Sequence, residues 1–179
     1  AAGLAQKFTQ QGYRVSYLKP VGYSASPTRR QDRDALLMQK LLKMDVPLDV
    51  ITPVVSVPSY LSGQARQDEL LNKIKKAYET VAEKADIVLI GGPPRPHMLA
   101  SVGLDTAKLA ELFGSAVVYL IKIENDYSVD MAVFINNYLR KSGIEIIGNI
   151  FNHVSRPLLA KTEGIYRHLL EQQGYRTLG

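Results

Sequence analysis

The sequence predicts an α/β fold in which a doubly wound, mostly parallel sheet is covered by helices on both faces. Three observations predict it. Short β-branched runs alternate with helical stretches, these runs are apolar throughout, and each of them ends in a polar or glycine-rich loop. Strands without polar alternation are typical of parallel sheets that are buried on both faces. The length of 179 residues is that of one domain.

The predicted elements follow one another along the whole chain. An amphipathic helix in "AAGLAQKFTQQG" opens it and ends at Gly12. Strands are predicted in the β-branched runs 13–18, 86–91, 115–123 and 144–151. Helices are predicted at 33–43, 66–84, 106–113, 128–141 and 157–173. Asp105 is placed to cap one of these helices, and Pro157 is placed in the first turn of another.

Composition excludes several classes of site and partner. The chain has no cysteine, so disulfides and thiolate metal sites are excluded, and its three histidines lack the spacing of metal ligands. The net charge of +5 is spread along the chain, and the tightest basic cluster, "TRRQDR" (28–33), is interpreted as a solvated loop. We therefore expect no nucleic-acid partner. No apolar run reaches the roughly 20 residues that a membrane span needs, so we expect a cytoplasmic protein without a membrane partner.

Unusual residues stand where the predicted strands end. The first strand runs directly into Lys19, Pro20 and Gly22. We expect Lys19 to lie exposed at the rim, Pro20 to take the chain out of the sheet, and Gly22 to let the backbone pass close to a bound group. The other strands end in "GGPPRPHM" (91–98), "ENDYS" (124–128) and "FNHVSRP" (151–157). Because ligands of parallel sheets bind beyond the carboxyl ends of the strands, this rim is the predicted site.

Five segments of the chain, in order, resemble the dethiobiotin-synthetase-like P-loop family. This family includes cobyrinate amidase-type synthetases and the N-terminal domain of long phosphate acetyltransferases. The segments are "GYRVSYLKPVG", "DRDALLMQKLLKMDVPLDVITPVV", "ADIVLIGGPP", "SVGLDTAKLAELFGSAVVYLI" and "IIGNIFNHVSRP". The resemblance covers nearly the whole chain. It implies a P-loop NTPase-like, three-layer α/β/α fold that binds ATP with Mg²⁺.

The resemblance also implies a role for individual residues. Lys19 would act beside the substrate carboxylate or the γ-phosphate, and Asp34 would contact Mg²⁺. Asn152 would bind the adenine edge, Gly91 and Gly92 would lie in the cofactor-binding loop, and the Ser62-Gly63-Gln64 turn would line the same cleft.

A structural alternative stays open for each polar residue of this set. In the alternative interpretation, Lys19 is a charged side chain that keeps the end of the strand hydrated. Asp34 is then a charge favoured by the dipole of a helix N-terminus, and Asn152 is a turn residue whose side chain bonds its own backbone.

The chain departs from the family in two places. The loop G-x-x-x-x-G-K-[ST] is absent from residues 1–179. We expect a single domain over 1–179 that lacks its N-terminal first strand and P-loop and is truncated at its C-terminus. Gly91 stands where the family has a glutamate that supports the metal. Glu124 or Asp126 would replace that carboxylate or, in the alternative that we prefer, cap the following helix.

The resemblance leads to two functional hypotheses. The first is an ATP- and Mg²⁺-dependent synthetase (a ligase) that activates a small-molecule carboxylate by phosphorylation. The second is a non-catalytic, nucleotide-sensing regulatory domain of a larger protein, such as a phosphate-acetyltransferase-like enzyme. Gly91 favours the second. A structural or dimerising module is a third, weaker hypothesis. The expected partners are a carboxylate or nucleotide ligand and either a second copy in a homodimer or the rest of a longer multidomain chain.

Overall fold

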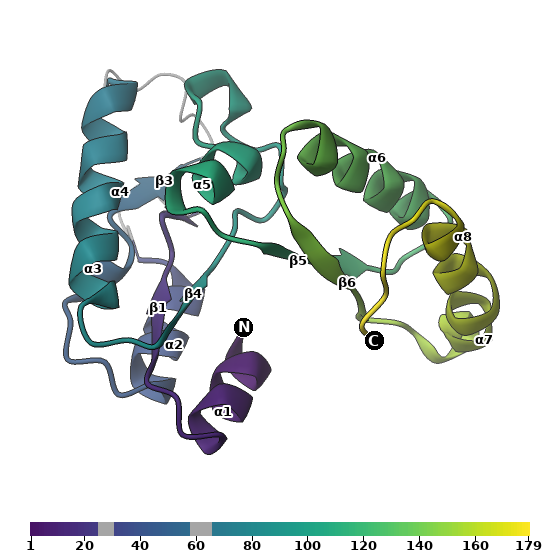
Figure 1. The fold of residues 1–179 in the computed structure, drawn as a ribbon, viewed down its shortest axis with the longest axis horizontal. Coiled ribbons are helices and arrows are strands. Elements are labelled where there is room, and N and C mark those ends of the chain that lie inside the picture. The colour runs from purple at the N-terminus through teal and green to yellow at the C-terminus, as the bar shows by residue number, and fades with distance from the viewer. Residues whose placement is uncertain (25–30, 58–65) are drawn as a thin grey trace. The chain divides into compact units, whose positions relative to one another are not determined.

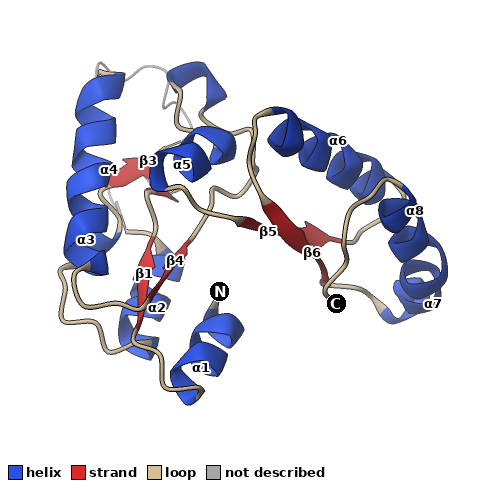
Figure 2. Cartoon of the chain, in the orientation of Figure 1, coloured by secondary structure: helices blue, strands red, loops and turns tan. Residues whose placement is uncertain are grey.

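The computed structural model describes residues 1–24, 31–57 and 66–179. The chain separates into two compact units, Ala1–Thr106 and Ala107–Gly179, each with its own helices and strands (Figure 1). Figure 2 shows helices and strands in both units, and helices stand between most of the successive strands along the chain. The Ser62-Gly63-Gln64 turn and part of "TRRQDR" lie outside the described residues. The predicted single domain stays a prediction.

The first unit contains two pairs of parallel strands. β1 (Val15–Leu18) pairs with β4 (Ile87–Ile90), and β2 (Val21–Tyr23) pairs with β3 (Val54–Ser56). Its helices are α1 (Ala2–Gln10), α2 (Arg33–Leu41), α3 (Leu48–Ile51), α4 (Gln67–Ala82) and a 3-10 turn, Ala100–Val102. Strands β2 and β3 were not predicted.

Pro20 does not send the chain over the rim. The chain leaves β1 at Leu18, and after Lys19 and Pro20 it continues as β2 beside β3. The backbone N–H of Lys19 donates to the carbonyl of Ile51 at 2.8 Å, so the proline occupies a junction between two strand pairs. Proline is tolerated at such a junction because its missing N–H is needed by no ladder.

The core of the first unit lies between β1 and the helices around it. Ala5 of α1, Ala35 and Met38 of α2 and Ile51 of α3 pack with Tyr17 in one buried cluster. On α4, the buried residues Ile74, Ala77 and Val81 recur at helical spacing and α4 packs along β1, β3 and β4. Each large apolar side chain buried in this way contributes about 1.5–3 kcal/mol.

A bidentate ion pair fixes the amino ends of β1 and β4. The guanidinium of Arg14 donates to both carboxylate oxygens of Asp86, at 3.0 Å from Nε and 2.6 Å from Nη2, and the Arg14 backbone N–H donates to the same carboxylate at 2.8 Å. The Asp86 N–H donates back to the Arg14 carbonyl. The hydrogen bonds that the carboxylate accepts from the Arg14 side chain and from the Arg14 backbone N–H lower the pKa of Asp86 to about 2.

The second unit contains one pair of parallel strands and a set of helices. β5 (Val117–Lys122) pairs with β6 (Ile146–Asn152), with one irregularity between Val117 and Val118. Its helical elements are α5 (Thr106–Phe113), α6 (Tyr127–Lys141), a 3-10 turn (Arg156–Leu158), α7 (Leu159–Lys161), a π-helical turn (Thr162–Tyr166) and α8 (Arg167–Gln172). The predicted helix 157–173 is therefore helical as far as Gln172 but changes its hydrogen-bond pattern three times, with Pro157 in the first turn.

Two fully buried amides connect α6 to β6. The side-chain N–H of Asn136 donates to Asn149 Oδ1 at 2.8 Å and to the carbonyl of Ala132 at 2.7 Å. In return, Asn149 Nδ2 donates to Asn136 Oδ1 at 3.3 Å and to the carbonyl of Arg176 at 3.1 Å. Both polar side chains are thereby satisfied within the core.

The predicted fold class is confirmed. The strand pairs are parallel, and helices connect strands along the chain, as in P-loop NTPase-like α/β folds. None of the helices within 1–24, 31–57 and 66–179 has the length and apolar character to cross a membrane.

Candidate functional site

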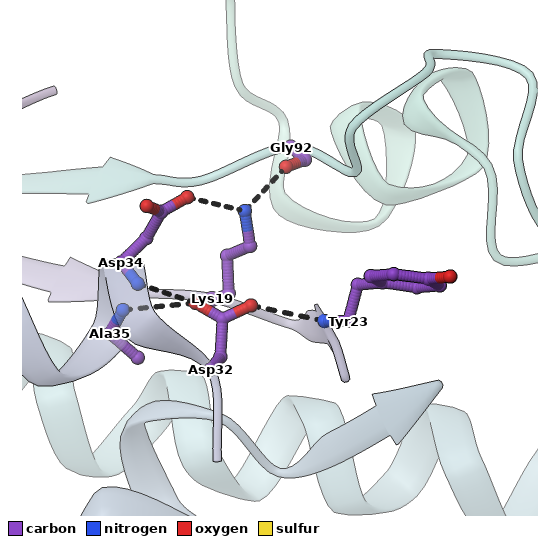
Figure 3. Close-up of polar contacts among 6 residues, drawn as sticks. All are labelled: Lys19, Tyr23, Asp32, Asp34, Ala35 and Gly92. Atoms are coloured by element: carbon purple, nitrogen blue, oxygen red, sulfur yellow. Dashed lines mark hydrogen bonds and ion pairs between the residues drawn. The ribbon is translucent and has the colours of Figure 1, made fainter. Parts of the chain in front are cut away.

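Lys19 lies at the carboxyl end of β1 with its ammonium held between two partners. Its Nζ donates to the carbonyl of Gly92 at 2.9 Å and lies 3.5 Å from Oδ2 of Asp34 (Figure 3). The residue is only 5% exposed. The expectation of an exposed lysine is therefore wrong, because the loop after β4 and the first turn of α2 converge on the amine.

Two carboxylates begin α2, and they have different surroundings. Asp32, 5% exposed, is the N-cap: its Oδ1 accepts from the N–H groups of Asp34 and Ala35, and its Oδ2 accepts from the N–H of Tyr23 at 3.0 Å (Figure 3). The side chain of Asp34 is 71% exposed. Asp34 lies in the first turn of α2, where the helix dipole favours a negative charge. Its position therefore suits both the predicted Mg²⁺ contact and the structural alternative.

Asp32 is the residue of this group that sequence reasoning overlooked. An aspartate just before an amphipathic helix is a typical N-cap signal, and "QDRDAL" carries two candidates, Asp32 and Asp34. Its carboxylate, which accepts three backbone N–H donors, has little capacity left for a ligand. Asp34 is thus the open carboxylate beside Lys19.

Three glycines border this group, and each has different surroundings. A Cβ on Gly22 would lie 2.6 Å from Thr52 Cγ2 and 2.8 Å from Asp32 Cβ, so Gly22 makes room for the chain itself and not for a bound group. A Cβ on Gly91 would lie 2.2 Å from the hydroxyl oxygen of Tyr17. At Gly92 the nearest atom would be 3.9 Å away. Gly91 is therefore required by close packing, and Gly92 is not.

The donor set fits a magnesium ion that is also held by a ligand. No cluster of three or more His, Asp or Glu side chains occurs in the part of the chain that the structure describes. Mg²⁺, however, is commonly bound through one or two carboxylates together with substrate phosphates and water. The exposed carboxylate of Asp34 meets that requirement, whereas Gly91 offers no side-chain ligand.

Asn152 belongs to the second unit. It is the last residue of β6 and is exposed, and its backbone carbonyl accepts from the N–H of Ile123 at 3.1 Å. Within the described ranges its side-chain amide makes no hydrogen bond, so the bond to its own backbone that a turn role implies is not seen. The amide is free to donate and accept.

Glu124 and Asp126 are paired with lysines of the second unit. Glu124 forms an ion pair with Lys122, and Oδ1 of Asp126 accepts from Lys161 Nζ and from the Tyr166 hydroxyl, each at 2.5 Å. These contacts lower the pKa of both carboxyl groups. The predicted capping role is wrong for the Asp126 side chain: it occupies the N-cap position of α6 without a capping hydrogen bond. Ser128 Oγ instead accepts from the N–H groups of Glu124 and Asn125.

Two cavities lie away from Lys19. One, of about 780 Å³, lies at the amino end of β1, and its lining includes Arg14, Val15 and Lys43. The other, of about 330 Å³, lies beside Asp126 and Lys161 in the second unit. Sequence reasoning predicted neither, because apolar periodicity carries no information on how closely neighbouring elements pack.

The comparisons with known proteins agree with the resemblance. The profile of a family described as "AAA domain" matches residues 1–179. An ATP-dependent dethiobiotin synthetase from Methanocaldococcus jannaschii is 26% identical over 160 residues, which are 85% of this chain and 72% of that protein. A phosphate acetyltransferase from Haemophilus influenzae is 29% identical over 102 residues, which are 55% of this chain and only 14% of that protein. The chain belongs to this AAA-domain family, and its resemblance to the dethiobiotin-synthetase-like P-loop proteins is confirmed.

Proposed function

We propose that this chain is part of a nucleotide-binding domain that holds ATP with Mg²⁺ at the carboxyl ends of β1 and β4. One observation carries the proposal: the buried ammonium of Lys19 lies between the Gly92 carbonyl and the exposed carboxylate of Asp34. An ammonium has three donors, and among the described residues two of them have a partner, so a third can serve a ligand oxygen. The similarity to a protein named an ATP-dependent synthetase supports the choice of ligand.

Each side chain has a distinct role in this proposal. Asp34 supplies a carboxylate oxygen to Mg²⁺, which when bound offsets the negative charge of the phosphates. Lys19 donates to a phosphate oxygen, while the Gly92 carbonyl fixes the direction of its amine. Asn152, in the second unit, is a separate candidate: its side-chain amide makes no hydrogen bond to the described residues and can donate and accept together at a base edge. Gly92 keeps the loop beside Lys19 free of a side chain, while Gly91 accommodates Tyr17 and the Lys19 stem.

The synthetase reading adds one chemical step to binding. An oxygen of a substrate carboxylate attacks the γ-phosphorus of ATP, the bond from that phosphorus to the β–γ bridging oxygen breaks, and an acyl phosphate and ADP result. Lys19 lies where its charge offsets the negative charge that builds up on the transferred group.

The second candidate is a nucleotide-sensing domain that performs no chemistry. One observation favours it: a side chain at position 91 is excluded by Tyr17 and Lys19, so the loop after β4 brings no second carboxylate to Asp34. The match to a short part of a phosphate acetyltransferase also supports a domain within a larger protein.

Isothermal titration calorimetry of the full-length protein with ATP, with and without Mg²⁺, tests the proposal. We expect binding that Lys19→Met weakens by at least about tenfold, since the methionine keeps the apolar stem but removes the charge. Asp34→Asn should remove most of the gain in affinity that Mg²⁺ provides. Asp49→Asn is the matched control, because Asp49 is an exposed carboxylate in the first turn of α3.

Absence of binding by any purine nucleotide at millimolar concentration refutes the proposal. ADP production in the presence of a carboxylate substrate separates the two candidates. Binding without turnover favours the nucleotide-sensing domain.

A further inference from the structure

Tyr17 lies beside Lys19 and occupies the volume of a side chain at position 91. Alternate residues of a strand point to the same face, so Tyr17 and Lys19 share one side of the chain as it leaves β1. A Cβ on Gly91 would lie 2.2 Å from the Tyr17 hydroxyl oxygen and 2.9 Å from Cδ of Lys19. The hydroxyl therefore stands where the loop after β4 would otherwise place a side chain.

No hydrogen bond joins the Tyr17 hydroxyl to the residues that the structure describes; the residue is only 2% exposed, yet its hydroxyl is not one of the fully buried unpaired oxygens, which in these residues are those of Thr52 and Thr162. Its ring is held by the core cluster of α1 and α2, which leaves the hydroxyl directed towards Gly91 and the Lys19 stem. A tyrosine hydroxyl on an otherwise buried ring normally finds a partner, and a hydroxyl that is not fully buried can find it in water or in a ligand.

The hydroxyl is suited to donate and not to act as an anion. Burial, and then the negative charges of Asp34 and Asp32, raise the pKa of Tyr17 above its ordinary value. Tyr17 therefore stays protonated. The neighbouring ammonium of Lys19 retains one donor beyond those directed to Gly92 and Asp34.

We propose that the Tyr17 hydroxyl is a ligand-binding group of this site, and that it and the Lys19 ammonium donate to oxygens of one phosphate group. The identity of that group as a nucleotide phosphate rests on the proposed function. A neutral donor thus faces the anion at the position where a side chain of residue 91 would lie. A neutral donor attracts a phosphate without a bridging cation, so part of the phosphate affinity should persist when Mg²⁺ is absent.

The test compares Tyr17→Phe with the unaltered full-length protein. Tyr13→Phe is the matched control, because Tyr13 is 48% exposed and precedes the amino end of β1, away from Lys19. Each protein is titrated by calorimetry with sodium tripolyphosphate without Mg²⁺ and with ATP plus Mg²⁺, and its thermal unfolding is recorded without ligand. We expect Tyr17→Phe to weaken tripolyphosphate binding about tenfold, as the loss of a hydrogen bond to a charged group does.

Unfolding without ligand distinguishes a ligand contact from a structural bond. Removing a hydroxyl that bonds to none of the described residues should leave the unfolding temperature of Tyr17→Phe unchanged or slightly raised, and Tyr13→Phe should bind both probes normally. A lowered unfolding temperature together with unchanged binding would show that the hydroxyl has a structural partner, such as a buried water, and would overturn the inference.

The remaining outcomes separate this inference from the proposed function. If the unaltered protein binds ATP and Tyr17→Phe binds both probes equally well, the inference is wrong and nucleotide binding stands. If only tripolyphosphate binds and its affinity depends on Tyr17, nucleotide binding is wrong and the inference stands. If neither probe binds the unaltered protein, both are wrong.

Discussion

Gly91→Ala is the substitution whose effect the structure defines most sharply. The added methyl group would lie 2.2 Å from the Tyr17 hydroxyl oxygen, 2.9 Å from Tyr17 Cζ and 2.9 Å from Lys19 Cδ. Contacts this short are not tolerated, so the tyrosine ring or the lysine stem must move. Both are buried, and the ring is packed against the core of the first unit.

The magnitude follows from two opposing effects. Forcing extra volume into a packed core costs about 1–3 kcal/mol. Replacing glycine by alanine at a permissive backbone conformation returns about 0.4–1 kcal/mol by restricting the unfolded chain. The free energy of unfolding of Gly91→Ala should therefore fall by about 1–2 kcal/mol net. At about 2–4 °C per kcal/mol for a chain of this length, the unfolding temperature should fall by roughly 2–8 °C.

Differential scanning calorimetry of Gly91→Ala, Tyr17→Phe and the double variant measures the effect and its cause. Tyr17→Phe removes the atom at 2.2 Å, so the double variant should recover part of the loss. Gly92→Ala is the control within the same loop, because its methyl group would meet nothing nearer than 3.9 Å. Equal unfolding temperatures for Gly91→Ala and Gly92→Ala would show that Tyr17 does not hold the volume beside Gly91.

Two further predictions concern the second unit and the amino ends of β1 and β4. If the side-chain amide of Asn152 binds the base, Asn152→Ala should weaken ATP binding by about 1–3 kcal/mol in calorimetry. Asn125→Ala is the control, because Asn125 is also exposed and should not affect binding. Equal affinities for the two variants would leave Asn152 without a binding role. The pKa of Asp86 is lowered to about 2 from 3.8, so its pairing with Arg14 stabilises the fold fully above pH about 4 and is lost as the pH falls towards 2. Chemical denaturation between pH 5 and 2 should therefore show a smaller acid-induced loss of stability in Asp86→Asn than in the unaltered protein, and parallel curves would contradict this.

Regular elements were predictable because their signals are local. Each predicted strand and helix occurs in the structure, and helix α5 coincides with the predicted range 106–113. Strands β2 and β3 were missed because three residues are too few for a periodic pattern, and both are recognisable only by their pairing with each other.

The candidate site was predictable in position but not in its contacts. The carboxyl ends of apolar strands indicated Lys19 and the Gly91-Gly92 loop correctly as neighbours, and the Lys19–Gly92 hydrogen bond shows them together. The burial of Lys19 could not be predicted, because it depends on Asp34 and on the Gly91-Gly92 loop, which is far away in the sequence. The sequence suggested no role for Tyr17, since nothing local indicates that Gly91 leaves space for its hydroxyl.

The paired amides of Asn136 and Asn149 constrain how the second unit can misfold. A slip of β6 by one residue would turn Asn149 to the opposite face and place an apolar neighbour against Asn136. Two core amides would then lose their partners at once, a penalty that a purely apolar contact would not impose. The amides thus discriminate against competing strand alignments during folding, in addition to any stability that they contribute to the final fold.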